Sequence, residues 1–105
     1  MSEPARGEIW WAEAPDEQPR PYLILTRDEA IPVLNKVLAA AVTRTVRGIP
    51  SEVALGPSEG LKTECAASMD NIAPIRKSYL VRRIGALSRR RRHELCEALS
   101  AAVDC

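Results

Sequence analysis

Short apolar runs separated by Gly- and Pro-containing turns occupy most of this chain, and one convincing helical pattern follows them at the C-terminal end. A parallel sheet needs helices between its strands, and this sequence has none there. The residues after Ser88 place leucines at helical spacing, which predicts a helix from Arg89 to about Val103 with Ser88 as its N-cap. The expected strands cover residues 8–13, 22–26, 36–43, 51–55, 65–72 and 80–85. We therefore predict a mainly β fold, a small and strongly bent antiparallel barrel with a C-terminal α-helix.

The chain has 105 residues and a mass of 11.6 kDa, which suits one domain over residues 1–105. No apolar stretch approaches the roughly 18 residues of a membrane span, and the N-terminus lacks the layout of a signal peptide. A cytoplasmic protein without a membrane partner is expected. The three cysteines, Cys65, Cys96 and Cys105, form no CxxC motif, which favours free thiols in the core or the tail.

The formal net charge of +1 hides an uneven distribution. Residues 73–92 contain eight basic side chains and no acidic one, whereas residues 1–17 contain five acidic ones. A basic face of this kind is consistent with binding of a polyanion such as RNA. The alternative is an ordinary solvated face, because successive residues of a helical run such as Arg89–Arg92 turn by about 100° and cannot all face one partner.

The sequence offers little for metal or histidine chemistry. His93 is the only histidine, Cys96 follows three residues later, and no carboxylate cluster has the spacing of a zinc or magnesium site. A GxSxG nucleophile motif and a glycine-rich phosphate loop are also absent from the sequence. If the chain is an enzyme, we expect it to act without a metal or another cofactor.

An arginine precedes the second predicted strand, and a threonine ends the third. Pro21 fixes its own backbone and biases Arg20 towards an extended conformation, so the guanidinium leaves the sheet from a stiff position. The apolar run 39–42 closes on Thr43, with Arg44 behind it. A cation and a hydroxyl at the ends of two adjacent strands could flank one phosphodiester.

RNA carries its own nucleophile, because the 2′-hydroxyl can attack the neighbouring phosphate. An enzyme need only orient the groups, stabilise the crowded phosphorane and assist proton transfer. Arg20 suits charge stabilisation and proton donation to the leaving oxygen, whereas arginine is a poor general base. Thr43 is expected to position the phosphate through a hydrogen bond.

These residues also have ordinary structural interpretations. Arg20 could pair with Asp16 or Glu17 at the rim of the sheet, and Thr43 could be a plain strand residue. The pair at 70–71, aspartate and asparagine, could simply form a turn.

Trp10 and Trp11 are adjacent in the first predicted strand, so their side chains point to opposite faces. One ring should belong to the core. The other could stack on a base or pack in a dimer interface. The sequence does not say which is which.

Five elements, taken in order, resemble a known family. They are Arg6–Trp10 near the start, Arg20–Asp28, Val42–Thr43, Gly60–Leu61 before Cys65, and Asp70–Ile72. In this order and spacing they resemble the MazF/PemK (Kid) toxins of bacterial toxin–antitoxin systems. The resemblance implies a homodimeric SH3-like barrel that cuts single-stranded RNA at short motifs without a metal, leaving a 2′,3′-cyclic phosphate and a 5′-hydroxyl. It also implies a cognate antitoxin, MazE-like or another small protein, that occupies the RNA groove and the dimer surface.

The resemblance also assigns the site residues. Arg20 matches the catalytic arginine of the family and Thr43 its catalytic threonine. Asp70 and Asn71 match a pair that helps to hold RNA, and the loop 14–19 matches one that moves over the groove. The expected RNA-binding residues are Gln18, Pro19, Arg44, Ser68, Asp70 and Asn71.

This chain departs from the family next to the threonine. Ala41–Val42 precede Thr43 where many members have Pro-Leu, and Arg44 follows where they have serine, so the cleavage motif is not predicted. Two other functions stay open. The same superfamily contains CcdB-like proteins that trap DNA gyrase, and a catalytically inactive nucleic-acid-binding or regulatory barrel could retain the antitoxin groove.

Overall fold

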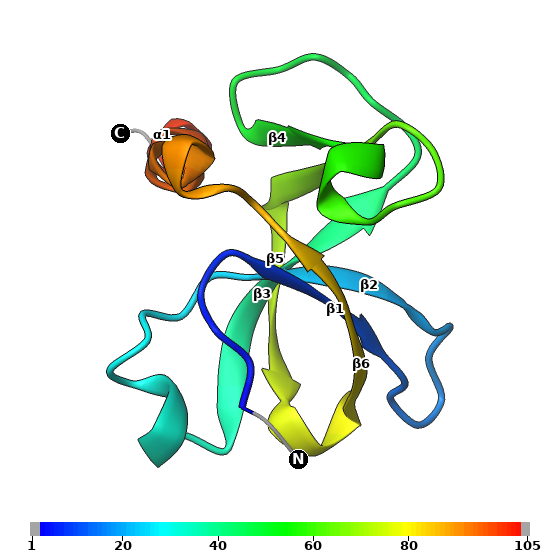
Figure 1. Ribbon diagram of the computed structural model, residues 1–105, viewed down its shortest axis with the longest axis vertical. Coiled ribbons are helices and arrows are strands. Elements are labelled where there is room, and N and C mark those ends of the chain that lie inside the picture. Colours follow the sequence, from blue (N-terminus) through cyan, green and yellow to red (C-terminus); the bar gives the residue numbers. More distant parts are fainter. Residues whose placement is uncertain (1–2, 104–105) are drawn as a thin grey trace.

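The computed structural model describes residues 3–103 as a bent antiparallel sheet with a short C-terminal helix (Figure 1). The elements are β1 (Glu8–Ala12), β2 (Arg20–Ile24), β3 (Lys36–Thr43), β4 (Glu52–Leu55), β5 (Cys65–Arg76), β6 (Leu80–Ala86) and α1 (His93–Ala102). The strands lie in the order β4-β5-β3-β2-β1-β6, and each neighbouring pair is antiparallel. The predicted mainly β architecture with one terminal helix is confirmed.

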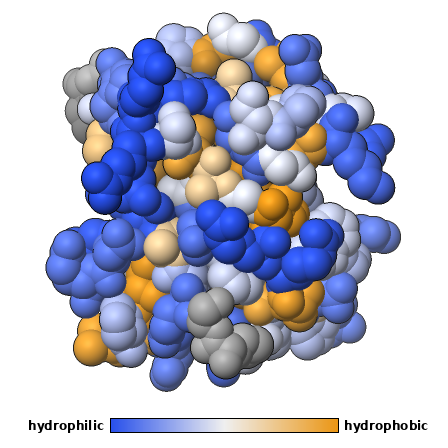
Figure 2. Space-filling model, viewed as in Figure 1, coloured by the Kyte–Doolittle hydropathy of each residue, from blue (hydrophilic) through white to orange (hydrophobic). Residues whose placement is uncertain are grey.

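Side chains alternate along the strands, so the sheet has a core on each face. Ile9 and Leu23 belong to one core, which also receives Leu95 of α1. Trp10 and Ile24, the next residues along the same two strands, belong to the other. In Figure 2 the visible surface is mostly hydrophilic, with smaller apolar patches between the polar side chains, as expected when most large apolar groups lie inside.

β3 has its predicted bounds, whereas β5 and β2 do not. β5 continues past its predicted end at Ile72, because the ladder with β3 runs on and pairs Pro74 with Leu38. β2 begins earlier than predicted, at Arg20, which lies opposite Ala12 of β1. Both differences arise from pairing between segments that are distant in the sequence.

The helix begins later than predicted. Residues 89–91 form a 3₁₀ turn in which the Arg91 amide donates to the Ser88 carbonyl at 3.0 Å, and α1 starts at His93. Ser88 is the N-cap residue of this 3₁₀ turn but makes no side-chain cap bond, and the N-cap residue of α1 itself is Arg92. Within residues 3–103 the structure has no helix that is both long and apolar enough to cross a membrane.

The predicted apolar stripe of the helix covers the first core. Leu95 and Ala98 are buried, and Leu99 and Ala102 pack against the same core while partly exposed. Val103, the alternative last member of the stripe, is 63% exposed. The stripe therefore ends with Ala102.

Two glycines let the loop after β4 lie directly against β6. A Cβ atom on Gly85 would come within 1.9 Å of the Glu59 carbonyl oxygen, and one on Gly60, whose φ is 92°, within 2.4 Å of the Ile84 carbonyl oxygen. The buried Glu59 side chain closes the turn by accepting a hydrogen bond from the Gly56 amide at 2.7 Å. These contacts fix the backbone of the loop that follows the turn.

The cysteines within residues 3–103 are free thiols. Cys65 is buried, and this burial, followed by the negative charge of Glu59, raises the pKa of its thiol. Cys96 is exposed on α1. Cys105, predicted to be a free thiol, lies outside the described residues.

Candidate functional site

The start of β2 and the end of β3 bring the two predicted catalytic residues together. Tyr22 lies opposite Ala41 in the β2–β3 ladder, and continuing this register by two residues places Arg20 opposite Thr43. Residues directly opposite in such a ladder have Cβ atoms about 4.5–5.5 Å apart and share a face. Nη2 of Arg20 donates a hydrogen bond to the carbonyl oxygen of Val42 at 3.0 Å, which holds the guanidinium next to the threonine.

Arg20 keeps most of its hydrogen-bonding capacity free. A guanidinium has five N–H donors, and within residues 3–103 Arg20 uses one of them, for the bond to Val42. No ion pair joins it to Asp16 or Glu17 in this part of the chain, so the structure does not show the alternative rim salt bridge. A half-buried arginine with free donors is suited to contact a phosphate.

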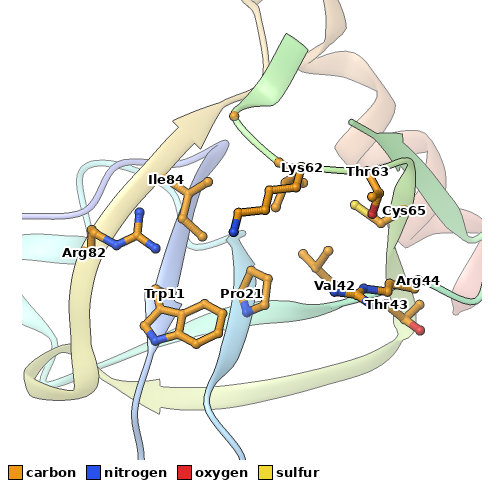
Figure 3. A pocket seen from close by; sticks show the side chains of 12 residues that line it. Trp11, Pro21, Val42, Thr43, Arg44, Lys62, Thr63, Cys65, Arg82 and Ile84 are labelled. Carbon is orange, nitrogen blue, oxygen red and sulfur yellow. The ribbon is translucent and has the colours of Figure 1, made fainter. Parts of the chain in front are cut away.

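Thr43 presents its hydroxyl in a fixed position. Its Oγ1 accepts a hydrogen bond from the Thr45 amide at 3.1 Å, so the oxygen is held while its proton can still be donated. Figure 3 shows this oxygen turned outward, away from the space into which Val42 points. The hydroxyl of Thr43 therefore points away from this space, although Thr43 and Val42 both contribute to its lining.

A cavity of about 420 Å³ lies on the Val42 face of the strand ends (Figure 3). A row of side chains across the sheet forms its floor, because Trp11 of β1 lies opposite both Arg82 of β6 and Pro21 of β2. Leu61, from the loop after the 3₁₀ turn, contributes to the facing wall. The cavity thus combines strands from both ends of the chain with the loop that the two glycines position.

Three basic side chains line this cavity, and none of its lining residues is acidic. They are Arg44 after β3, Lys62 in the loop and Arg82 on β6. In Figure 3 the Lys62 amine and the Arg82 guanidinium point into the space beside Trp11. All three bases are exposed, and in the described part of the chain none of them forms an ion pair or hydrogen bond. The cavity is therefore suited to an anionic ligand that also has an apolar or aromatic part.

The other predicted RNA-binding residues do not line the cavity. Gln18–Pro19 are exposed between β1 and β2. Asp70 and Asn71 are exposed on β5, inside a strand and not in the turn considered as an alternative, and Ser68 is half-buried nearby. The Asp70 carboxylate accepts a hydrogen bond from the Ser51 hydroxyl at 2.5 Å.

The β3–β5 ladder changes register where these β5 residues lie. Ala40 pairs with Ile72, but Val42 pairs with Ala67, so β5 has extra residues between the two pairs. Such an irregularity bends a strand and redirects its side chains. It places residues 68–71 of β5 opposite Ala41 of β3, two residues before Thr43.

Comparison with known proteins agrees with the motifs. Residues 5–103 match the family model described as PemK-like, MazF-like toxin of type II toxin–antitoxin system. The chain is also 43% identical over 103 residues to the probable endoribonuclease MazF5 of Mycobacterium tuberculosis (strain ATCC 25618 / H37Rv), a match that covers 97% of this chain and 94% of that protein. This chain belongs to the PemK/MazF toxin family.

Solved structures of MazF proteins have the same fold. The Mycobacterium tuberculosis toxin MazF-mt6 superposes with a TM-score of 0.85 at 37% sequence identity, covering 92% of this chain and 96% of that one. An endoribonuclease in complex with its cognate antitoxin, from a mycobacterial species, superposes with a TM-score of 0.83 at 29% identity, covering 95% and 94% of the two chains. The predicted family and its fold are therefore confirmed.

Sequence reasoning missed several cavity residues of this MazF-like chain. Of the two tryptophans, Trp10 is the core residue, at 5% exposure, and Trp11 is the half-buried one that lines the cavity. The opposite orientation of the pair was predicted. Lys62 and Arg82 were not identified, because only the pairing of β1 with β6 and the position of the loop bring them to Trp11.

The basic run at residues 89–92 contains one structural arginine. Arg91 donates from Nη1 to Glu59 at 3.1 Å, from Nε and Nη2 to Glu94 at 2.9 and 2.8 Å, and from Nη2 to the Ala54 carbonyl at 2.6 Å. Hydrogen bonding with Glu94 raises the pKa of Arg91, and the same contact lowers the pKa of Glu94. The other three arginines of the run are exposed, as the solvated-face alternative expects.

Proposed function

We propose that this chain is a sequence-selective, metal-independent endoribonuclease toxin that cleaves single-stranded RNA and is neutralised by a cognate antitoxin. Membership of the PemK/MazF family and relatives named as endoribonucleases support this function. The observation that carries it is the position of Arg20, bonded to the Val42 carbonyl and opposite Thr43, with most of its donors free.

The proposed reaction is an attack of the RNA 2′-oxygen on the adjacent phosphorus. The new bond joins that oxygen to phosphorus, and the bond from phosphorus to the 5′-oxygen of the next nucleotide breaks. The 2′-hydroxyl loses its proton to solvent, and the leaving 5′-oxygen gains one. The products are a 2′,3′-cyclic phosphate and a 5′-hydroxyl.

Arg20 and Thr43 have distinct roles in this reaction. Arg20 stabilises the negative charge that grows on the phosphorane and donates the proton to the leaving oxygen, after which solvent restores its charge. Thr43 donates a hydrogen bond that orients the phosphate. These steps need no metal, and within residues 3–103 no three His, Cys, Asp or Glu side chains form a group that could hold one.

RNA contacts are proposed for Gln18, Pro19, Arg44, Ser68, Asp70 and Asn71, which surround the strand ends. A homodimer would extend this surface, and a cognate antitoxin would cover it. A related endoribonuclease has been solved in complex with its cognate antitoxin. We place this function in the cytoplasm, where messenger and structural RNA are accessible.

A test uses purified protein and a long single-stranded RNA in EDTA, with mapping of fragment ends. The wild type should give discrete cyclic-phosphate ends, and Arg20→Ala and Thr43→Ala should not. Arg76→Ala, an exposed arginine at the far end of β5, is the matched control and should cut normally. Intact RNA together with arrested DNA supercoiling would instead favour the gyrase-trapping alternative, which the named relatives do not support.

A further inference from the structure

We propose that the cavity beside the strand ends is a nucleotide subsite, which binds a nucleotide adjacent to the scissile phosphate. Trp11 would stack on its base, and Lys62 and Arg82 would contact its phosphate. The proposal rests on the proposed RNA-cleaving function and adds to it residues that neither the motifs nor the family match assigned.

The floor of the cavity contains a hydrogen-bonded indole ring on which a flat ligand ring could stack. Trp11 is half-buried, and its indole Nε1 donates to Glu13 Oε2 at 3.1 Å, which fixes the rotation of the side chain. Pro21 and Arg82 flank it as cross-strand neighbours. A fixed aromatic ring with an open face is the usual platform for a base in single-strand binding proteins, because every base has a stacking face.

The charges of the cavity fit a phosphate. Lys62 reaches the tryptophan from the loop and Arg82 from the neighbouring strand β6, and neither has a hydrogen-bond or ion-pair partner within residues 3–103. By contrast, Arg83, the next residue of β6, points elsewhere and pairs with Glu8 at 2.8 Å. The two cations at the cavity are therefore available to an anion, whereas their neighbour is neutralised.

One residue of β3 connects this cavity to the proposed catalytic pair. The carbonyl oxygen of Val42 accepts the hydrogen bond from Arg20, and the side chain of Val42 lines the cavity. A phosphate at Arg20 and a base in the cavity would therefore contact opposite sides of the same residue. Consecutive nucleotides of one strand can span such a short separation, and about 420 Å³ lies within the range of small-ligand sites.

The alternative occupant is a segment of a protein partner with acidic and apolar side chains. The combination of a hydrogen-bonded indole with two unpaired cations beside it favours a nucleotide, since an apolar side chain needs no flat platform. Binding measurements separate the two occupants.

The experiment measures RNA binding apart from cleavage. The probe is a 12-nucleotide RNA that contains the motif mapped with the wild type, with a 2′-deoxy sugar at the cut position so that it cannot react. If the wild type cuts no RNA, a mixed-sequence 20-nucleotide RNA serves as the probe. The variants are Trp11→Leu, Trp11→Phe and the double variant Lys62→Gln/Arg82→Gln, and the matched control for charge is Lys36→Gln/Arg76→Gln, at the opposite end of the β3–β5 ladder.

Trp11→Leu should raise the Kd about 5- to 100-fold, and Trp11→Phe should restore most of the affinity. The double cavity variant should weaken binding and reduce the slope of log K against log salt by about 0.7, as expected when one phosphate of single-stranded RNA is no longer neutralised. The control should leave both quantities unchanged.

Unchanged RNA affinity in Trp11→Leu and in the double cavity variant would overturn the proposal and assign the cavity to a protein partner. An equal loss of affinity in the control would overturn it as well, because it would show a diffuse charge effect. A wild type that binds the probe through the cavity but cuts no RNA would leave the subsite standing and refute the nuclease function, so the two failures are distinguishable.

Discussion

Two arginines in this molecule differ sharply in how many of their donors are free. Arg91 stands in a run of four arginines, yet its guanidinium is bound by Glu59, Glu94 and the Ala54 carbonyl. Arg20 stands alone in the sequence, and its guanidinium makes one bond, to a backbone carbonyl. The density of basic residues in a sequence therefore says little about which cation can bind a ligand.

The difference follows from what surrounds each side chain. Arg91 ends the 3₁₀ turn that leads into α1, next to a buried carboxylate that must be neutralised. Arg20 begins a strand behind a proline-bounded loop, where the nearby acids do not reach it in the described structure. One arginine holds the fold together, and the other is proposed to act on a substrate.

Arg20→Ala should separate the two roles most clearly. We expect cleavage of single-stranded RNA to fall about 10³-fold, because a preorganised charge donor is lost from the transition state. Stability should change by less than about 1 kcal/mol, since one hydrogen bond at the rim is removed. Fragment yield on gels and urea unfolding measure the two effects. An unfolded variant would contradict the assignment of Arg20 to function alone.

Arg91→Ala should show the reverse. Removing the guanidinium leaves Glu59 buried without its partner, so the free energy of unfolding should fall by about 2–3 kcal/mol. Cleavage by the protein that remains folded should match the wild type. Chemical denaturation and cleavage below the unfolding transition measure this, and normal stability with lost cleavage would reverse the comparison.

Gly85→Ala tests the segment between the Arg91 contacts and the cavity, since the turn that carries Glu59 leads into the loop that carries Lys62. The new methyl group would collide with the Glu59 carbonyl, so we expect a loss of about 1–3 kcal/mol and weaker RNA binding as the loop is displaced. Gly56→Ala is the control, because its Cβ would meet atoms at 3.9 Å, an ordinary contact. Equal effects of both substitutions would refute the steric explanation.

Acidification should lower the free energy of unfolding by weakening the contact between Glu94 and Arg91. The pKa of Glu94 is lowered from 4.5 by its hydrogen bond to Arg91, so the unfolded chain takes up the proton first as the pH falls. The resulting stabilisation is complete above about pH 4.5 and is lost as the pH falls through the lower, folded value. We expect less than about 1 kcal/mol, seen as a drop in urea midpoint between pH 6 and pH 3.5. Glu94→Gln should reduce that drop, and an unchanged drop would contradict this origin.

Arg90→Ala should have the smallest effect. Arg90 is exposed beside Arg91, so its loss should change stability by less than about 0.5 kcal/mol and RNA affinity only slightly at physiological salt. Thermal unfolding and RNA titration check this. A large effect on stability or on RNA affinity would show that the four arginines at 89–92 act together, and would contradict a structural role for Arg91 alone.

Local patterns predicted much of the fold. The apolar run 36–43 predicted β3 with its bounds, and leucine spacing predicted the face that α1 buries. The extension of β5 through Pro74 was missed because it depends on pairing with β3. The 3₁₀ turn before α1 was missed because serine is a common N-cap residue, so Ser88 was expected to start the α-helix directly. Secondary-structure propensity depends on the residues of one segment, whereas the ends of a strand also depend on the segment with which it pairs.

For the site, the sequence named the arginine and the threonine but not the cavity beside them. Arg20 and Thr43 lie at recognisable strand ends, so ordered motifs could point to them. Trp11 and Arg82 become neighbours only when the first and last strands pair, which no local pattern reveals. Glu59 had a local signal, because a glutamate three residues after Gly56 is the spacing of a capping box.

The contact of Gly60 and Gly85 across the loop and β6 has a consequence for how such a protein can diversify. The two positions admit no side chain, so the loop keeps this path only while both remain glycine. The three side chains that follow, at residues 61–63, face the cavity on a backbone that does not depend on their identity. New ligand preferences can therefore arise by single exchanges at these positions while the architecture that carries them stays constant.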